Sequence, residues 1–316
     1  MIGPWKKQNH SGWRAALVPA AQETGLAFVR RRKGERPLLQ HCAAYPASEI
    51  KAEHVLAAMI NGRQLARAPV SAVISPDDYQ LMQVEAPQVA PAEMRAAVRW
   101  KMRDLISFPL DEAVVDTFDL PEPARQSQAR MVFALAARSS AVQRLAGLVA
   151  PRARGFDVID IPELCLRNLS ALLPQDEAGV AMLAFGQDFA HLLITCRGVL
   201  HLTRRIDLSR AITSADVLDL DAAPRLDVSG LALELQRSLD YYENVYDRPP
   251  ISELVLAPPD DRVRGLAAAL ARETSVKIAL LEPERLFEIA DGIEIDTRWN
   301  ALIALGAALR ADQTDA

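Results

Sequence analysis

The sequence predicts an α/β (α+β) protein of two lobes, with a subdomain inserted in the first lobe. Three observations support this prediction. Short apolar runs of strand length follow segments of helical spacing along most of the chain. A succession of three strands opens the chain near residue 13 and recurs near residue 180, which indicates an internal duplication. The length of 316 residues also suits about two domains of ordinary size.

The composition indicates a folded protein of a reducing compartment. Half of the residues are hydrophobic and 24% are charged, so a sizeable core is available. Cys42, Cys165 and Cys196 lie far apart in apolar sequence, which favours buried free thiols. The net charge of −5 gives no general attraction to nucleic acid or anionic lipid.

Apolar runs such as 301–309 are shorter than the ~20 residues that cross a bilayer, and the N-terminus lacks the apolar run of an export signal. We expect a cytoplasmic protein without direct membrane insertion.

The first half of the chain reads as three antiparallel strands followed by further helices and strands. Arg32–Glu35 carries a glycine between two apolar runs and predicts a hairpin turn. Ser48 is a suitable N-cap for a helix that ends before Gly62. The expected strands are 15–18, 25–31, 37–45, 69–74 and 156–161, and the expected helices are 48–61 and 162–173. We assign residues 12–78, with 157–174, to the core of the first lobe.

Residues 79–156 form the predicted inserted subdomain, with strands at 80–86, 113–118 and 131–137 and helices from 91 and at 140–149. At 100° per residue, the first helix gathers Met94, Val98, Met102 and Leu105 on a core-facing side. Trp100 lies roughly opposite that side. The helix ends at Phe108-Pro109, because a residue before proline avoids the α region.

The second lobe is predicted to span 175–316, after a linker at Pro174–Glu177. Its strands are expected at 180–185, 190–196 and 198–205, with a turn at Arg197-Gly198. The helix 229–246 places leucines and tyrosines on one stripe. Strands 251–256 and 276–281 and helices 262–273 and 298–310 complete the expected lobe.

Three stretches resemble a known family. They are "MRAAVRWKMRDLISFPLDEAVVDTFDL" at 94–120, "VFALAARSSAVQRLAGLVAPRARGFDVIDIPELCLRNL" at 132–169 and "ELQRSLDYYEN" at 234–244. The chain resembles the PilM-like actin-fold proteins of type IV pilus assembly, and more closely the MshI branch from the mannose-sensitive haemagglutinin (MSHA) pilus. The resemblance implies an actin-like fold, whose lobes each open with a three-stranded meander.

The resemblance also implies where a nucleotide would bind, and this chain departs from the family at each of those places. Where the first lobe of the family reads Asp-Ile-Gly-Ser-Ser-Ser-x-Lys, this chain has Val18–Gly25, including Ala20 and Glu23. The second-lobe Asp-Ile-Gly-x-x-x-Thr becomes Ala184–Ala190, which keeps Gly186 but replaces the metal-directed aspartate by Ala184. The adenosine-side Ser-Gly-Gly is Ala257-Pro258-Pro259, and proline has no amide to offer.

We therefore expect no catalytic residues, no cofactor and no metal site, with ATP binding as the less favoured alternative. Glu23 or Asp188 could replace a lost carboxylate, although a solvated turn is the simpler interpretation of both. His191 and His201 could face each other across the Arg197-Gly198 turn, but no third ligand accompanies them. We expect these histidines, with His41 and His54, to be structural.

The strongest candidate for a functional surface is the tryptophan-bearing helix with its arginines. Tryptophan and arginine are common at binding hot spots. The alternative is that another subdomain covers Trp100 and that the arginines pair with nearby carboxylates. The resemblance implies that residues 80–120 and the first lobe receive the cytoplasmic N-terminal tail of a membrane-anchored pilus protein. The candidate partner-binding residues are Arg95, Arg99, Trp100, Arg103, Phe108 and Pro109.

The function expected from these features is that of a non-enzymatic scaffold, peripheral to the inner membrane through its partners. The expected partners are a PilN-like inner-membrane pilus protein and the assembly motor, with no nucleic acid. The main alternative is an active actin-like ATPase whose nucleotide state gates those contacts. A third is the cytoplasmic domain of a type II secretion protein, although such chains continue into a transmembrane helix and this one ends at Ala316.

Overall fold

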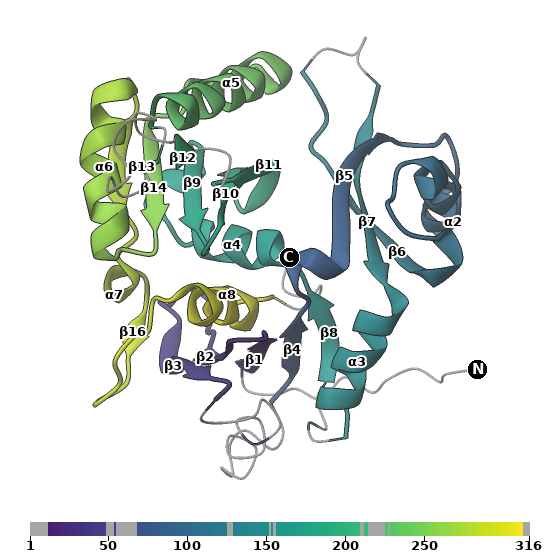
Figure 1. Cartoon of the computed structure of the whole chain (residues 1–316), viewed down its shortest axis with the longest axis horizontal. Helices are drawn as coiled ribbons and strands as arrows, with labels where there is room; N and C mark the ends of the chain where they lie inside the picture. Colours follow the sequence, from purple (N-terminus) through teal and green to yellow (C-terminus); the bar gives the residue numbers. More distant parts are fainter. Residues whose placement is uncertain are drawn as a thin grey trace. The chain divides into compact units, whose positions relative to one another are not determined.

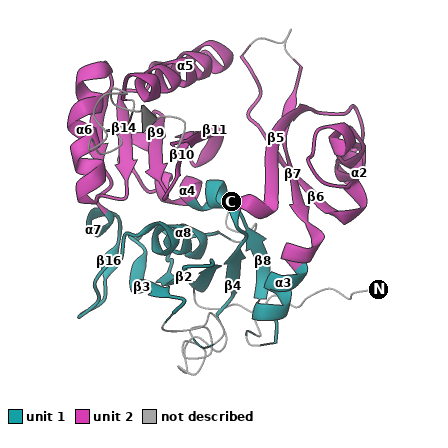
Figure 2. Ribbon diagram, viewed as in Figure 1, with its two compact units in different colours: residues 1–75, 143–165, 283–316 teal, residues 76–142, 166–282 magenta. Residues whose placement is uncertain are grey.

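The computed structural model describes residues 12–48, 54, 68–124, 129–151, 153, 156–208, 212–213, 225–226 and 228–311. The chain divides into two compact units (Figure 2). One unit comprises residues 1–75, 143–165 and 283–316, and the other comprises residues 76–142 and 166–282. The predicted helix at 48–61 lies outside the described residues, apart from residues 48 and 54.

The first unit is built on a six-stranded sheet with the order β16-β3-β2-β1-β4-β8. Its first three strands form the predicted antiparallel meander, and β4 and β8 then join β1 in parallel (Figure 1). The two parallel strands are neighbours although the inserted segment separates them in sequence. The bounds are β1 Trp13–Pro19, β2 Glu23–Arg30, β3 Leu38–Pro46, β4 Val70–Val73, β8 Phe156–Asp160 and β16 Glu288–Ile289.

The C-terminal helix α8 (Trp299–Ala308) packs against this sheet, so its predicted place in the second lobe is wrong. Residues 301–308 are all buried, as expected of a helix that is apolar all round. Its backbone approaches β2 so closely at Gly25 that any Cβ there would collide with the carbonyl of Asn300. Strand β16 also pairs with β3. Residues 283–311 therefore belong to the first unit, because their apolar surface is complementary to its sheet.

The inserted subdomain has the predicted β-α-β-β-α order and its own sheet, β5-β7-β6. The helix α2 and the 3-10 turn after it cover one face of this sheet through Val98 and Met102, which pack with Phe108, Val115 and Ala134. By contacts residues 76–142 of this segment group with residues 166–282, whereas residues 143–149 of its last helix belong to the first unit. Its elements are β5 Tyr79–Glu85, α2 Pro91–Lys101, β6 Ala113–Asp119, β7 Met131–Arg138 and α3 Ser139–Val149, with short 3-10 turns at Pro76–Asp78, Met102–Asp104 and Leu110–Glu112.

The predicted core position of Leu105 is wrong, since this side chain is 54% exposed. The α-helix ends at Lys101 and the chain continues as the 3-10 turn Met102–Asp104. A 3-10 turn advances about 120° per residue and not 100°. Leu105 is thereby rotated out of the apolar side that the helical projection predicted.

The other sheet of the second unit repeats the design of the first, with the order β11-β10-β9-β14-β15. A three-stranded antiparallel meander is again followed by parallel strands on the far side of its first strand. This repetition confirms the predicted duplication. The strands are β9 Val180–Phe185, β10 Phe189–Cys196, β11 Val199–Asp207, β14 Glu253–Ala257 and β15 Lys277–Leu280.

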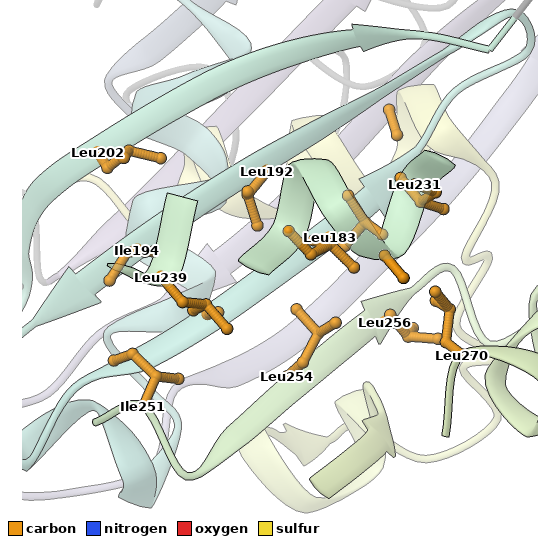
Figure 3. Packing of buried hydrophobic residues seen from close by; sticks show 14 of the residues in the cluster. Leu183, Leu192, Ile194, Leu202, Leu231, Leu239, Ile251, Leu254, Leu256 and Leu270 are labelled. Atoms are coloured by element: carbon orange, nitrogen blue, oxygen red, sulfur yellow. The ribbon is translucent and has the colours of Figure 1, made fainter. Parts of the chain in front are cut away.

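The helices α5 (Val228–Tyr246) and α6 (Asp261–Glu273) pack on this second sheet and form its core (Figure 3). The predicted stripe of α5 is buried, from Leu231 to Tyr246. Asp260 caps α6 by accepting a hydrogen bond of 2.8 Å from the backbone N–H of Val263. The remaining elements are α4 Pro162–Ser170, a 3-10 turn at Pro174–Glu177, α7 Pro283–Leu286 and the two-residue strands β12 Ile212–Thr213 and β13 Arg225–Leu226.

The stretch predicted as a linker, Pro174–Glu177, is instead a 3-10 turn that is bonded into the second unit. Asp176 is only 4% exposed. Its carboxylate accepts hydrogen bonds of 2.5 Å from the Thr195 hydroxyl and from the backbone N–H of Gly198. The polar composition that suggests a linker therefore serves buried hydrogen bonds, and the division between the units falls earlier, after Cys165.

Candidate functional site

The first-lobe turn that the nucleotide site would require is a tight hairpin between β1 and β2. The backbone N–H of Ala20 donates to the carbonyl of Glu23 at 3.1 Å. Glu23 is half-buried and not the solvated turn residue that we expected. Its carboxylate accepts hydrogen bonds from Arg298 at 3.2 Å and from Asn300 at 3.1 Å. Both oxygens therefore hold the start of α8, which gives Glu23 a structural role.

A second anchor of the same region is Asp296, which lies two residues before Arg298. Burial favours the neutral form of this carboxyl, but hydrogen bonds from Arg298 and from the backbone N–H of Ala44 outweigh it and lower its pKa. The Ala44 bond measures 2.8 Å. The carboxylates around this turn are thus bound by protein donors.

The second-lobe turn, between β9 and β10, has its backbone groups occupied in a similar way. The N–H of Gly186 donates to the carbonyl of Phe189 at 2.9 Å, and its own carbonyl accepts from Arg262 at 2.9 Å. The ring of Phe189 lies 2.6 Å from where a Cβ of Gly186 would be, so a larger residue would require that ring to move. The guanidinium of Arg205 covers that ring at 4.5 Å. Asp188 is an exposed turn residue, as its simpler interpretation predicts.

The remaining positions of the implied nucleotide site carry no polar side chain. Ala184 is fully buried at the end of β9 and pairs with Ala257 of β14, after which comes Pro258. A phosphate or a metal needs amides and carboxylates that point outward from such turns. The described turns lack most of these groups or use them internally, although Asp188 remains an exposed carboxylate.

The tryptophan-bearing surface is the second candidate site, and it consists of Trp100, Arg103 and Leu105. The side chain of Trp100 is 64% exposed, so nothing in the described part of its own unit covers it. The guanidinium of Arg103 lies 4.3 Å above the indole ring. A flat aromatic with a cation on one face can contribute both apolar area and charge to a partner.

The other predicted members of this surface have different roles. Arg95 pairs with Asp116 of β6 at 2.9 Å, and both side chains are exposed. Arg99 donates to the carbonyls of Ala113 and Leu110 at 2.7 and 2.5 Å, and so holds the turn before β6. The expected stripe of three arginines is therefore not a single basic surface.

The prediction that Phe108 is a surface contact is wrong, since its ring is 7% exposed and packs in the core of the inserted subdomain. The guanidinium of Arg138 lies 4.5 Å from that ring. Pro109 is exposed. In the motif Phe108-Pro109, the phenylalanine therefore packs in the core and the proline lies in an exposed turn.

A groove of about 330 Å³ lies within the second unit, between strand β5 of the inserted subdomain and strand β11 with helix α5. No feature of the sequence predicted this groove. A pocket of this size is at the lower end of the range for specific ligand sites. Its lining residues are Leu81, Met82, Gln83, Phe133, Leu202, Thr203, Arg204 and Tyr241.

His191, His201 and the three cysteines lie inside the protein. His191 pairs across the ladder with Arg205, so the suggested facing of His191 and His201 is wrong. His201 lies edge-on between the rings of Tyr242 and Tyr246. The three cysteines are buried thiols and not disulfide-bonded, as predicted. Within the described ranges no group of three His, Cys, Asp or Glu side chains could hold a metal ion.

The comparisons with known proteins identify the fold. No family model matches the chain, and no curated protein matches it in sequence. A chain of the PilM-PilN type IV pilus biogenesis complex superposes with a TM-score of 0.64 and 22% identity, covering 94% of this chain and 97% of that one. The fold is actin-like.

Two further solved structures are similar over most of the chain. The cytoplasmic domain of EpsL, an inner-membrane component of the type II secretion system of Vibrio cholerae, has a TM-score of 0.48 and 11% identity, covering 95% of this chain and 96% of that one. A Bacteroides thetaiotaomicron protein with an actin-like ATPase fold has a TM-score of 0.47 and 8% identity, covering 90% and 96%. None of the described helices is long and apolar enough to cross a bilayer.

Proposed function

We propose that this protein is a non-enzymatic scaffold of type IV pilus assembly, which binds the cytoplasmic tail of a PilN-like inner-membrane protein. The observation that carries the proposal is the similarity to a chain of the PilM-PilN complex, which extends over 94% of this chain and includes the inserted subdomain. The proposal places the protein at the cytoplasmic face of the inner membrane through that partner. It also assigns the protein to the MSHA-type branch and gives it a contact with the assembly motor.

The internal hydrogen bonds of the two turns support the proposal that the protein is not an enzyme. Glu23 is held by Arg298 and Asn300, and both backbone groups of Gly186 are used within the protein. A nucleotide site at these turns would require breaking these hydrogen bonds and adding an aspartate at position 184. Each buried polar group that lost its partner in this way would lower the stability of the fold by about 1–3 kcal/mol.

Titration calorimetry with ATP and Mg²⁺ tests this part. We expect no binding heat up to millimolar nucleotide, while a known ATP-binding protein run in parallel sets the detection limit. Binding at low micromolar strength would instead support the alternative function, an actin-like ATPase whose nucleotide state gates its contacts.

The binding part is tested with synthetic peptides that cover the cytoplasmic N-terminus of a PilN-like inner-membrane pilus protein. If the tail docks on the Trp100 surface, Trp100→Ala should weaken binding by about 2 kcal/mol or more, roughly thirtyfold. The matched control is Leu233→Ala, which removes a 52% exposed apolar side chain from α5. Equal affinities for the wild type and Trp100→Ala would exclude this surface from the binding site.

A further inference from the structure

The turn between β2 and β3 concentrates positive charge in a chain whose net charge is negative. Residues 30–36 read Arg-Arg-Arg-Lys-Gly-Glu-Arg, which places five cations and one carboxylate in a single short stretch. Residues 31–36 are all exposed. We call residues 30–36 the basic hairpin. In a chain of net charge −5, it is a local surface that can attract an anionic partner.

The backbone of the basic hairpin has a defined conformation. The N–H of Glu35 donates to the carbonyl of Arg32 at 3.3 Å, which closes the turn. Gly34 within it has a φ of 79°, a conformation that glycine adopts without strain. At the base, the N–H of Arg31 donates to the carbonyl of Gly12 at 2.8 Å. These hydrogen bonds fix the place of the charges on the first unit.

The arginines at the base of the basic hairpin are also held by their side chains. Arg31 donates to the carbonyl of Leu309 at the C-terminal end of α8, at 2.6 Å, where a cation is favoured. Arg36 donates to the carbonyl of Arg285 at 3.2 Å. The guanidinium of Arg30 lies 5.3 Å from the centre of the Trp13 ring. The side chains at the base are thus ordered, and the tip projects beyond them.

Few carboxylates balance this charge. Arg32 pairs with Glu35 at 3.3 Å, but their side chains are 56% and 55% exposed, so water screens the pair. Lys33 makes no ion pair with any residue that the structure describes. Strand β16 brings one further exposed carboxylate to the base, because the N–H of Glu288 donates to the carbonyl of Pro37 at 2.9 Å. Five cations against these two carboxylates leave an excess of three positive charges.

The absence of apolar side chains narrows the choice among anionic partners. None of the large hydrophobic side chains that are exposed in the described part of the chain lies in the basic hairpin. A protein partner would therefore find no apolar anchor there. Nucleic-acid sites typically make about 6–10 phosphate contacts, more than the cations available here. A bilayer with anionic headgroups requires only clustered charge, and clusters of about 4–8 basic residues are typical of such contacts.

We infer that the basic hairpin contacts the headgroups of an anionic bilayer, without insertion into the hydrocarbon. Each basic residue near such a surface raises the affinity by a factor of about five, and salt screens the attraction. The contact is weak by itself. It becomes effective when a second attachment holds the protein close to the bilayer. This goes beyond the proposed function, which holds the protein at the membrane through its partner alone, because it adds a lipid contact that orients the first unit.

Neutralising the tip of the basic hairpin tests the inference. The double variant Arg32→Gln with Lys33→Gln removes two exposed charges and no buried contact. The matched control is Arg264→Gln with Arg272→Gln, two exposed arginines of α6, which changes the net charge equally. Each full chain is sedimented with vesicles of phosphatidylcholine, with and without phosphatidylglycerol, at low and at high ionic strength.

We expect the wild type and the α6 control to bind the phosphatidylglycerol vesicles equally, less at high ionic strength, and not to bind pure phosphatidylcholine. The hairpin variant should bind about thirtyfold more weakly, because two factors of about five are lost. No vesicle binding by the wild type, an equal loss in the α6 control, or unchanged binding by the hairpin variant would each overturn the inference. Tighter binding of a DNA duplex than of vesicles would make nucleic acid the partner and would also overturn it.

Titration of the same chains with the tail peptides separates the inference from the proposed function. Normal tail affinity in a wild type that does not bind vesicles would overturn the inference alone. Vesicle binding that depends on the basic hairpin, in a wild type that does not bind the tail, would support the inference and remove the proposed partner. We expect the hairpin variant to keep the tail affinity of the wild type within about twofold, since its substitutions are confined to the exposed tip.

Discussion

Helix α8 contacts α4 so closely at Gly306 that a larger residue there would disturb the packing of the first unit. A Cβ built on Gly306 would lie 2.6 Å from the carbonyl carbon of Cys165. Ordinary contacts between carbon atoms are about 3.5–4.0 Å. Gly306→Ala would therefore push two backbone segments apart by about 1 Å, and neither segment can rotate away as a side chain can.

The magnitude follows from two opposing effects. Overpacking a close-packed core costs about 1–3 kcal/mol, and contact with rigid backbone suggests the upper end. Alanine is favoured over glycine in a helix by about 1 kcal/mol. The net expectation is a loss of about 2 kcal/mol from the free energy of unfolding. With a urea m-value of about 2 kcal/mol per molar, the midpoint should fall by about 1 M.

The matched control is Gly147→Ala, in helix α3 of the same unit. Nothing lies within 4 Å of a Cβ at that position, so only the helix preference remains. We expect this variant to be more stable by about 0.5–1 kcal/mol. Urea unfolding is followed by tryptophan fluorescence in a Trp100→Phe background, so that the described tryptophans Trp13 and Trp299 report on this unit. A Gly306→Ala midpoint at or above that of the wild type would refute the packing of α8 described above.

Three further predictions concern single contacts. Asp176→Ala should lower the free energy of unfolding of the second unit by about 2–4 kcal/mol, because the buried Thr195 hydroxyl then has one hydrogen-bond partner fewer. Urea unfolding measures this change, and a decrease of under about 0.5 kcal/mol would contradict the prediction. Burial, assisted by Arg205, lowers the pKa of His191 to about 3. Since the unfolded chain binds a proton below pH 6.5 and the folded one does not, stability should fall by about 2 kcal/mol from pH 6.5 to pH 5, and His191→Leu should lack that component of the slope. Arg99→Met should lower thermal stability without abolishing tail binding, because Arg99 bonds only to backbone carbonyls of its own subdomain in the described residues; a specific loss of binding would show that it contacts the partner.

The order and type of most of the longer described elements could be predicted from local pattern, whereas the two-residue strands β12, β13 and β16 and the short helix α7 were not. Periodicity, caps and turn residues specify strands such as β1 and helices such as α5, because they depend on neighbours within a few residues. The duplication was also visible, since both meanders repeat the same succession of strands. It was harder to predict from the sequence which segments belong to which lobe. Helix α8 is apolar on all sides, and such a helix is buried wherever a complementary surface exists.

For the candidate site, the sequence predicted the outward-facing Trp100 and the lost groups of the nucleotide turns. It could not distinguish the roles of Arg95, Arg99 and Arg103, because identical side chains at helical spacing take different partners once β6 is in place. The groove between β5 and β11 could not be predicted for a similar reason. Whether β5 and β11 are edge strands depends on strand order, which no short stretch encodes.

The sequence by itself determined most of the helices and strands, the duplication of the chain, and the absence of an aspartate at position 184 and of an amide N–H at Pro258. Those properties depend on residue type and local spacing. Only the tertiary structure decided that α8 closes the first unit, that Glu23 is bound by Arg298, and that two strand edges border one groove. Each of these depends on contacts between residues far apart in the chain, where shape and unpaired backbone groups select the partner.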